Sequence, residues 1–121
     1  MPRMRIYKEF KFDSAHWLPH VPPTHKCANM HGHTYIIEVH VENELDPVLG
    51  WVLDYNDLRD IVEPLVNQLD HKVLNDVEGL ENPTAEHLAL WLWNQVKPSL
   101  PELVQVVVKE NPSNVCVYSG E

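Results

Sequence analysis

The chain has 121 residues, 44% of them hydrophobic, and a formal net charge of −9 at pH 7. This length and composition predict one globular domain, residues 1–121, and the acidic balance without a run of Lys or Arg argues against a nucleic-acid-binding protein. No segment is apolar enough for a signal peptide or long enough for a membrane span, and two cysteines are too few for a disulfide framework, so we expect a cytoplasmic protein.

Two segments with alternating apolar side chains open the chain, and each predicts a β-strand. The first covers residues 5–18, and the face that carries His16 also carries Phe10, Phe12 and Ser14. The second covers residues 33–45, and the face that carries His33 also carries Tyr35, Ile37, Val39 and Val41. Both histidines therefore lie on faces that we expect to point toward the core, whereas His40 lies on the opposite, polar face, where we expect solvent.

The next segment predicts an amphipathic helix. Asp54 or Asn56 can cap its N-terminus, and its apolar positions follow the spacing of one buried face: Leu58, Ile61, Val62, Leu65 and Leu69. Pro64 lacks the amide hydrogen that would bond the carbonyl oxygen of Asp60. We therefore expect a kink at Pro64 or two shorter helical pieces.

A second helix and a hairpin complete the pattern. The helix starts at Asn82-Pro83-Thr84 and ends at Lys97-Pro98, and its apolar face contains Ala85, Leu88, Ala89, Leu92 and Val96. Residues 102–110 and 115–118 then read as two strands of a hairpin. The order of two strands, two helices and two strands predicts an α+β fold.

Glu110 ends the apolar stripe of the third predicted strand. Val104, Val106 and Val108 mark the core face, and Glu110 is the next residue on that face. A carboxylate that points inward needs a partner. Either the strand has ended and Glu110 turns into solvent, or its carboxylate is available for the N–H groups of a ligand.

Three histidines form a candidate metal site. His31 and His33, separated by Gly32, project from one face of an extended segment and can point at one ion, while His16 supplies a third ligand from the preceding strand. Three neutral imidazoles would leave a tetrahedral zinc ion with one open position, which is typical of catalytic zinc rather than structural zinc.

Cys27 lies just ahead of the His-Gly-His pair and has three possible roles. It is a fourth zinc ligand that closes the site, a thiolate that acts as base or nucleophile, or a buried inert thiol. The polar, proline-flanked loop around Cys27 argues most strongly against the third role.

Asp70-His71 directly follows the first helix, where a protonated imidazole suits the helix dipole. A role as proton relay requires that His71 reach Cys27 in space.

Taken in order, several short motifs resemble a known family. They are His16, the Cys27-Ala-Asn-Met-His31-Gly-His33 segment, Asp70-His71, the Glu81-Asn-Pro-Thr84-Ala-Glu86 segment and Lys109-Glu110. Together they cover nearly the whole chain and resemble the 6-pyruvoyltetrahydropterin synthase superfamily. The interval of three residues between Cys27 and His31 resembles its 6-carboxytetrahydropterin synthase branch.

The resemblance implies a tunnelling fold (T-fold), a four-stranded antiparallel sheet with two helices on one face in the order ββααββ. It further implies a homohexamer, made of two stacked trimers, with the sites between subunits. The open edges and thin core of a four-stranded sheet of this length favour such an assembly on physical grounds.

The resemblance also implies a reaction, the conversion of 7,8-dihydroneopterin triphosphate to 6-carboxy-5,6,7,8-tetrahydropterin, acetaldehyde and triphosphate in queuosine biosynthesis. Zn²⁺ would be held by His16, His31 and His33. Cys27 would be the proton acceptor, His71 its relay oriented by Asp70, and Glu110 the pterin anchor. Thr84 and Glu86 would support the pterin or the relay, or merely begin the second helix. Lys26 is the candidate for the triphosphate, with Lys72 and Lys109 as the other basic candidates.

Two alternative functions remain open from the sequence. The first is a 6-pyruvoyltetrahydropterin synthase, which eliminates triphosphate from the same substrate. The second is a non-catalytic zinc-binding assembly module. The reaction product separates the two enzymes, and the effect of Cys27→Ala separates both from the assembly module.

Overall fold

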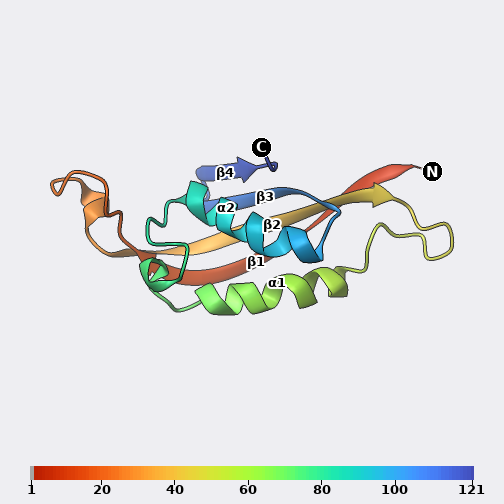
Figure 1. Ribbon diagram of the computed structural model, residues 1–121, viewed down its shortest axis with the longest axis horizontal. Helices are drawn as coiled ribbons and strands as arrows, with labels where there is room; N and C mark the ends of the chain where they lie inside the picture. The colour runs from red at the N-terminus through yellow and green to blue at the C-terminus, as the bar shows by residue number, and fades with distance from the viewer. Residues whose placement is uncertain (1) are drawn as a thin grey trace.

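A computed structural model describes residues 2–121 and has the element order ββααββ (Figure 1). The strands are β1 (Arg3–His16), β2 (His31–Glu44), β3 (Leu103–Asn111) and β4 (Asn114–Tyr118). The helices are α1 (Tyr55–Leu69) and α2 (Ala85–Val96), with short 3-10 helices η1 (Lys26–Ala28), η2 (Leu74–Asp76) and η3 (Lys97–Ser99). The predicted α+β class and element order are confirmed.

The four strands form one antiparallel sheet in the order β1-β2-β3-β4. In Figure 1, β1 and β2 form a long ribbon, with α1 alongside β1 and the shorter β3 and β4 beyond β2. Helix α1 contacts β1, and α2 contacts β3 and β4, so the two helices cover one face of the sheet. No helix in residues 2–121 is long and apolar enough to cross a membrane.

The core lies between this face and the helices. The strands contribute Phe12, Tyr35, Ile37, Val39, Val41, Val106 and Val108, and the helices contribute Leu58, Val62, Leu69, Leu88 and Leu92. The alternation predicted for the first two strands is therefore confirmed. On β1, the polar residues Ser14 and His16 continue the buried stripe to the end of the strand, and His16 is 1% exposed.

Of the two alternatives expected at Pro64, a kink or two shorter helical pieces, the structure excludes the second, because α1 is one continuous element through Pro64. Asp54 caps the helix, because its side chain accepts a hydrogen bond from the backbone N–H of Asn56. The turn after Pro64 keeps Leu65, Val66 and Leu69 buried against the core. This packing stabilises the second half of the helix despite the hydrogen bond that proline cannot donate.

The expectation that Val104 lies on the core face of β3 is wrong. A register shift in the β2–β3 pairing makes His40 the partner of Gln105 and Val41 the partner of Leu103. The extra residue, Val104, is half-buried, and Leu103 occupies the core in its place. Such a bulge moves the side chains before it by one position relative to strict alternation.

The expectation of an exposed His40 is also wrong. His40 lies on the sheet face opposite the helices, but it is only 8% exposed. The ring of Tyr7 stacks on the His40 ring, with ring centroids 4.4 Å apart. The Nε2 atom of His40 lies 2.8 Å from Oε1 of Glu38. Tyr7 on β1 and Glu38 on β2 therefore cover His40 without any second layer.

Candidate metal centre and active site

Three histidine rings meet where β1 ends and β2 begins. His16 and His31 are direct partners across the two strands, and His33 lies two residues further along β2 on the same face. The ring centroids are 4.6 Å apart for His16 and His31, 5.1 Å for His16 and His33, and 5.0 Å for His31 and His33. One nitrogen from each ring lies within 4.8 Å of the others. The ligand set expected from the sequence is therefore assembled by strand pairing alone.

The pKa values of two of the three imidazoles, those of His16 and His33, are lowered, which favours their neutral form. Burial lowers the pKa of His16 below its ordinary value, and the neighbouring His31 and His33 act in the same direction. Burial likewise lowers the pKa of His33. The buried Nε2 atoms of His16 and His33 have no hydrogen-bond partner among the described residues. Neutral imidazoles with buried, unpaired nitrogens fit a zinc ion, which binds deprotonated nitrogen.

Glu110 faces the three histidines from β3. Its Oε1 lies 3.7 Å from Nε2 of His16 and 4.0 Å from Nε2 of His33, and its side chain is 22% exposed. Of the two alternatives left open for Glu110, the structure supports the inward carboxylate. Glu110 lies two residues after the buried Val108 in β3, at the register shift between Lys109 and Asn111 in the β3–β4 pairing.

Cys27 lies in η1, beside the candidate metal site. A cavity of about 410 Å³ is lined by Cys27, Lys26, the three histidines, Leu18, Glu110, Asn111 and Asn114. The Cys27 carbonyl oxygen accepts a hydrogen bond from the Leu18 backbone N–H at 2.8 Å, which ties the loop to the end of β1. The cluster of mutually close ligand atoms at this site contains His16, His31 and His33 but not Cys27. This geometry favours a thiol beside the ion over a fourth ligand.

Asp70 and His71 form a pair at the end of α1, held by β1. Nδ1 of His71 lies 3.0 Å from Oδ1 of Asp70, and the same oxygen accepts the backbone N–H of Asp13 at 3.0 Å. This backbone hydrogen bond, followed by that from His71, lowers the pKa of Asp70 below its ordinary value. His71 has φ = 58°, a conformation costly for a non-glycine residue, and its N–H bonds the carbonyl of Asp13 at 2.6 Å.

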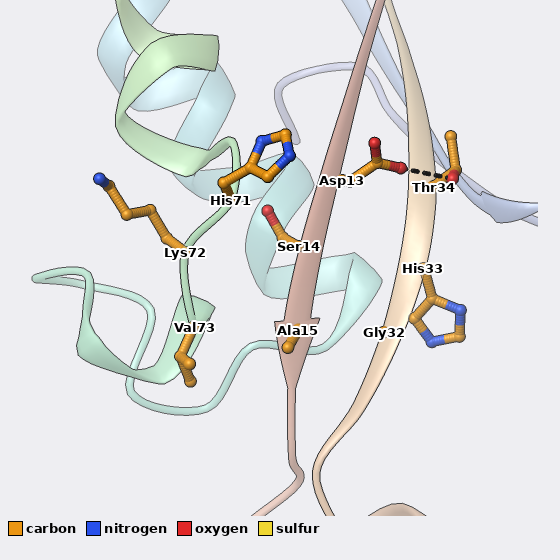
Figure 2. Close-up of a pocket in the computed structure, with 9 residues that line it drawn as sticks. All are labelled: Asp13, Ser14, Ala15, Gly32, His33, Thr34, His71, Lys72 and Val73. Atoms are coloured by element: carbon orange, nitrogen blue, oxygen red, sulfur yellow. Dashed lines mark hydrogen bonds between the residues drawn. The ribbon is translucent and has the colours of Figure 1, made fainter.

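Within one subunit, His71 does not line the cavity that contains Cys27. His71 instead lines another pocket of about 540 Å³, which shares only His33 with the Cys27 cavity, and its side chain is 78% exposed (Figure 2). Figure 2 shows His71 beside β1, and Asp13 bonded to Thr34 across β1 and β2. The contact with Cys27 that a relay requires is therefore not made within the subunit.

The remaining predicted residues fall into two groups. Thr84 caps α2, since its side chain accepts the N–H of His87, and it lines neither of the cavities that contain Glu110. Glu86 lines a cavity of about 440 Å³ together with Glu110, Cys116 and the 113–115 turn. Lys26 shares the cavity of Cys27, whereas Lys109 is paired with Glu38 at 3.0 Å.

Sequence reasoning missed several residues of the site. Asn114 lines both cavities that contain Glu110, and Asn111 and Cys116 line one each. The sequence signal that could have found them is the Asn-Pro-Ser-Asn turn directly after Glu110. Residues next to a strand end that carries a functional side chain lie close to the same cavity. Asn111 stabilises that turn, since its Oδ1 accepts the N–H groups of Ser113 and Asn114.

Comparison with known proteins identifies the family. The chain is 39% identical over 93% of its length, and 91% of the other protein's, to 6-carboxy-5,6,7,8-tetrahydropterin synthase of Synechocystis. It is 35% identical over 82% of its length, and 80% of the relative's, to dihydroneopterin monophosphate aldolase of Pyrococcus furiosus. Its fold matches 6-pyruvoyl tetrahydropterin synthase of Caenorhabditis elegans with a TM-score of 0.92 and 28% identity, covering 100% of this chain and 98% of the other. A model of the 6-pyruvoyl tetrahydropterin synthase family matches residues 5–121, and the chain belongs to that family.

Proposed function

We propose that the protein is a zinc-dependent lyase that converts 7,8-dihydroneopterin triphosphate to 6-carboxy-5,6,7,8-tetrahydropterin, acetaldehyde and triphosphate in queuosine biosynthesis. The observation that carries the proposal is one cavity lined by three histidines with mutually close ring nitrogens, a thiol and a carboxylate. A metal, a proton acceptor and a hydrogen-bonding anchor are what this substrate requires. The Synechocystis relative supports the choice of product.

His16, His31 and His33 would hold the zinc ion. When bound, zinc would supply Lewis-acid polarisation of the substrate's side-chain hydroxyls, making the hydrogens on their carbons more acidic. Cys27, in the wall of the same cavity, would accept such a proton as a thiolate. The unpaired Nε2 atoms of His16 and His33 support the ligand assignment.

Glu110 would anchor the pterin ring. Its two oxygens can accept hydrogen bonds from the ring amide and from the exocyclic amine, a charge-assisted bidentate pairing. Glu86 lines the adjoining cavity and would support the ring, whereas the capping bond of Thr84 supports a role in starting α2. Lys26 would pair with the triphosphate, since Lys109 already pairs with Glu38.

Asp70 and His71 would complete the site from a second subunit. His71 is exposed and lies outside the cavity of Cys27, so a relay between them needs a second copy of the chain. We propose a homohexamer of two stacked trimers with sites between subunits. The exposed apolar side chains of β4, Val115 and Val117, and its open edge support association through the sheet.

The test is to incubate the zinc-loaded protein with 7,8-dihydroneopterin triphosphate and identify the products by mass spectrometry. Carboxytetrahydropterin with acetaldehyde is the expected result. A pyruvoyl product would instead make the protein a 6-pyruvoyltetrahydropterin synthase, the alternative supported by the C. elegans structure. Unchanged substrate with zinc bound would favour an assembly module. The Pyrococcus furiosus relative makes a parallel assay with the monophosphate informative.

A further inference from the structure

His16 is in contact with a backbone carbonyl that no part of the proposed reaction uses. Its Nδ1 lies 2.7 Å from the carbonyl oxygen of Pro83, in the segment that precedes α2. The Tyr35 hydroxyl lies 3.3 Å from the same nitrogen. Both the His16 ring and the Tyr35 ring are buried, so water does not compete for these contacts.

These two distances decide which nitrogen of His16 carries the hydrogen. A carbonyl oxygen can only accept a hydrogen bond, so the short contact with Pro83 requires that Nδ1 of His16 be the donor. If the Tyr35 hydroxyl donated to Nδ1, the hydrogen would sit on Nε2 and the Pro83 carbonyl would lose its donor. The 2.7 Å contact is a full hydrogen bond, whereas 3.3 Å lies beyond the normal range for a hydroxyl donor.

The opposite nitrogen of His16 is the one that faces the site. With the hydrogen on Nδ1, Nε2 has a free lone pair, and this atom is buried without a partner among the described residues. His31 follows the same rule on the exposed side of the cluster, because its Nδ1 lies 2.8 Å from the carbonyl oxygen of Asn29. Two of the three ligands are therefore oriented by main-chain carbonyls.

The start of α2 holds the Pro83 carbonyl in place. The Asn82 carbonyl oxygen accepts hydrogen bonds from the N–H of Thr84 at 2.9 Å and from the Nδ1 of His87 at 2.8 Å. The Thr84 side chain in turn accepts the N–H of His87. Residues 82–84, which we call the capping segment, are thus bonded both within themselves and to the first turn of α2.

We propose that Pro83 is a positioning residue, whose carbonyl holds His16 in the Nδ1–H tautomer and thereby aims its Nε2 at the metal before any metal binds. The inference rests on the proposed zinc site. It gives the capping segment a role that is independent of substrate contact. Fixing the tautomer and ring orientation of a metal-binding histidine through its second nitrogen typically matters by about 10- to 100-fold in metal affinity.

The first experiment reads the tautomer directly in the metal-free protein. Uniformly ¹⁵N-labelled protein is stripped of metal, and long-range ¹H–¹⁵N spectra are recorded at a pH where His16 is neutral. The Nδ1–H tautomer of His16 is expected in the wild type and in Tyr35→Phe, which keeps the ring but lacks the hydroxyl. An Nε2–H tautomer in the wild type, or a change of tautomer in Tyr35→Phe, would overturn the proposal.

The second experiment measures zinc affinity by competition with a chromophoric chelator. Pro83→Gly loosens the backbone of the capping segment and is expected to weaken zinc binding about tenfold, whereas Pro83→Ala, the matched control, stays within about threefold. Circular dichroism of both metal-free variants establishes that each is folded. Equal zinc affinities in two folded variants would contradict the role of Pro83. Absence of zinc binding by the wild type would instead contradict the proposed function.

Discussion

His16 and His31 face each other as direct partners at the junction of β1 and β2, with ring centroids 4.6 Å apart. The antiparallel register brings together two residues that are fifteen positions apart in the chain. Because a one-residue slip would turn one of the two rings to the opposite face, the buried stripe of Phe12, Tyr35 and Ile37 also secures the metal site. Fold stability and metal binding are therefore expected to be coupled.

Removal of zinc should lower the melting temperature. An ion that binds only the folded chain adds stability, about 2.7 kcal/mol when the free ion is at 100 times its Kd. We expect His33→Ala to lose zinc, measured by elemental analysis, and to lose the difference in melting temperature between zinc-loaded and chelator-treated protein. His20→Ala, at an exposed position outside the cluster, is the control and should keep both. Full zinc content in folded His33→Ala would exclude His33 as a ligand.

Cys27→Ala should separate catalysis from metal binding. If Cys27 is the proton acceptor, turnover should fall by about 10²- to 10⁴-fold, the usual contribution of a positioned base. Zinc content and melting temperature should remain near those of the wild type, because the three histidines form the cluster without the thiol. Turnover is measured by product formation on a zinc-loaded sample. A joint loss of zinc and thermal stability would identify Cys27 as a fourth ligand instead.

Two inactive variants should restore activity when they are mixed. In a site with Cys27 from one subunit and His71 from another, random reassembly of Cys27→Ala and His71→Ala chains regenerates about one quarter of the sites. We expect each homo-oligomer to be inactive and the reassembled mixture to recover activity in that proportion. The measurement is turnover after joint dissociation and reassembly. A mixture as inactive as its components, despite mixed assembly shown by mass spectrometry, would place both residues in one subunit's site.

Glu110→Gln should weaken pterin binding without removing zinc. The amide keeps one acceptor oxygen but replaces the other with a donor NH₂ and lacks the charge. Hydrogen bonds to charged groups are worth about 1.5–3 kcal/mol, or roughly 10- to 100-fold in Kd. Pterin fluorescence titration measures the Kd, and Glu78→Gln, at an exposed position, is the control. An unchanged Kd together with lost zinc would indicate that the carboxylate serves the metal and not the pterin.

Glu38 should contribute a pH-dependent part of the stability. Burial raises the pKa of its carboxyl, but hydrogen bonds from His40 and Lys109 and the charge of Lys109 outweigh burial, so the net pKa lies below the ordinary 4.5. A lowered folded-state pKa means that the stabilisation is fully present above about pH 4.5 and is lost as the pH falls through the folded-state pKa.

We therefore expect Glu38→Gln to lower the free energy of unfolding at pH 7 by about 1–3 kcal/mol, measured by urea denaturation. The difference from the wild type should shrink as the pH falls below the ordinary value of the carboxyl. Glu44→Gln, at an exposed position, should change neither quantity appreciably. A deficit in Glu38→Gln that stays constant down to acid pH would show that packing, and not charge, accounts for it.

Local patterns in the sequence were sufficient for the order of the elements and for the histidines of the candidate metal site. Alternation placed His16 and His33 on buried stripes, and the structure confirms both stripes. The same reasoning failed at Val104, where a bulge shifts the register, and at His40, which a stacked tyrosine covers. Both failures have one cause, because alternation describes a single strand, whereas register shifts and cross-strand stacking depend on the neighbouring strand.

The sequence by itself therefore determined the α+β order, the buried faces and the residue types of the candidate site, since these depend on periodicity and short-range spacing. Only the tertiary structure decided that Glu110 faces His16, that the Pro83 carbonyl contacts Nδ1 of His16, and that His71 lies outside the cavity of Cys27. Each of these relationships joins segments more than forty residues apart. Their distances follow from how the sheet and helices pack, which no local pattern encodes.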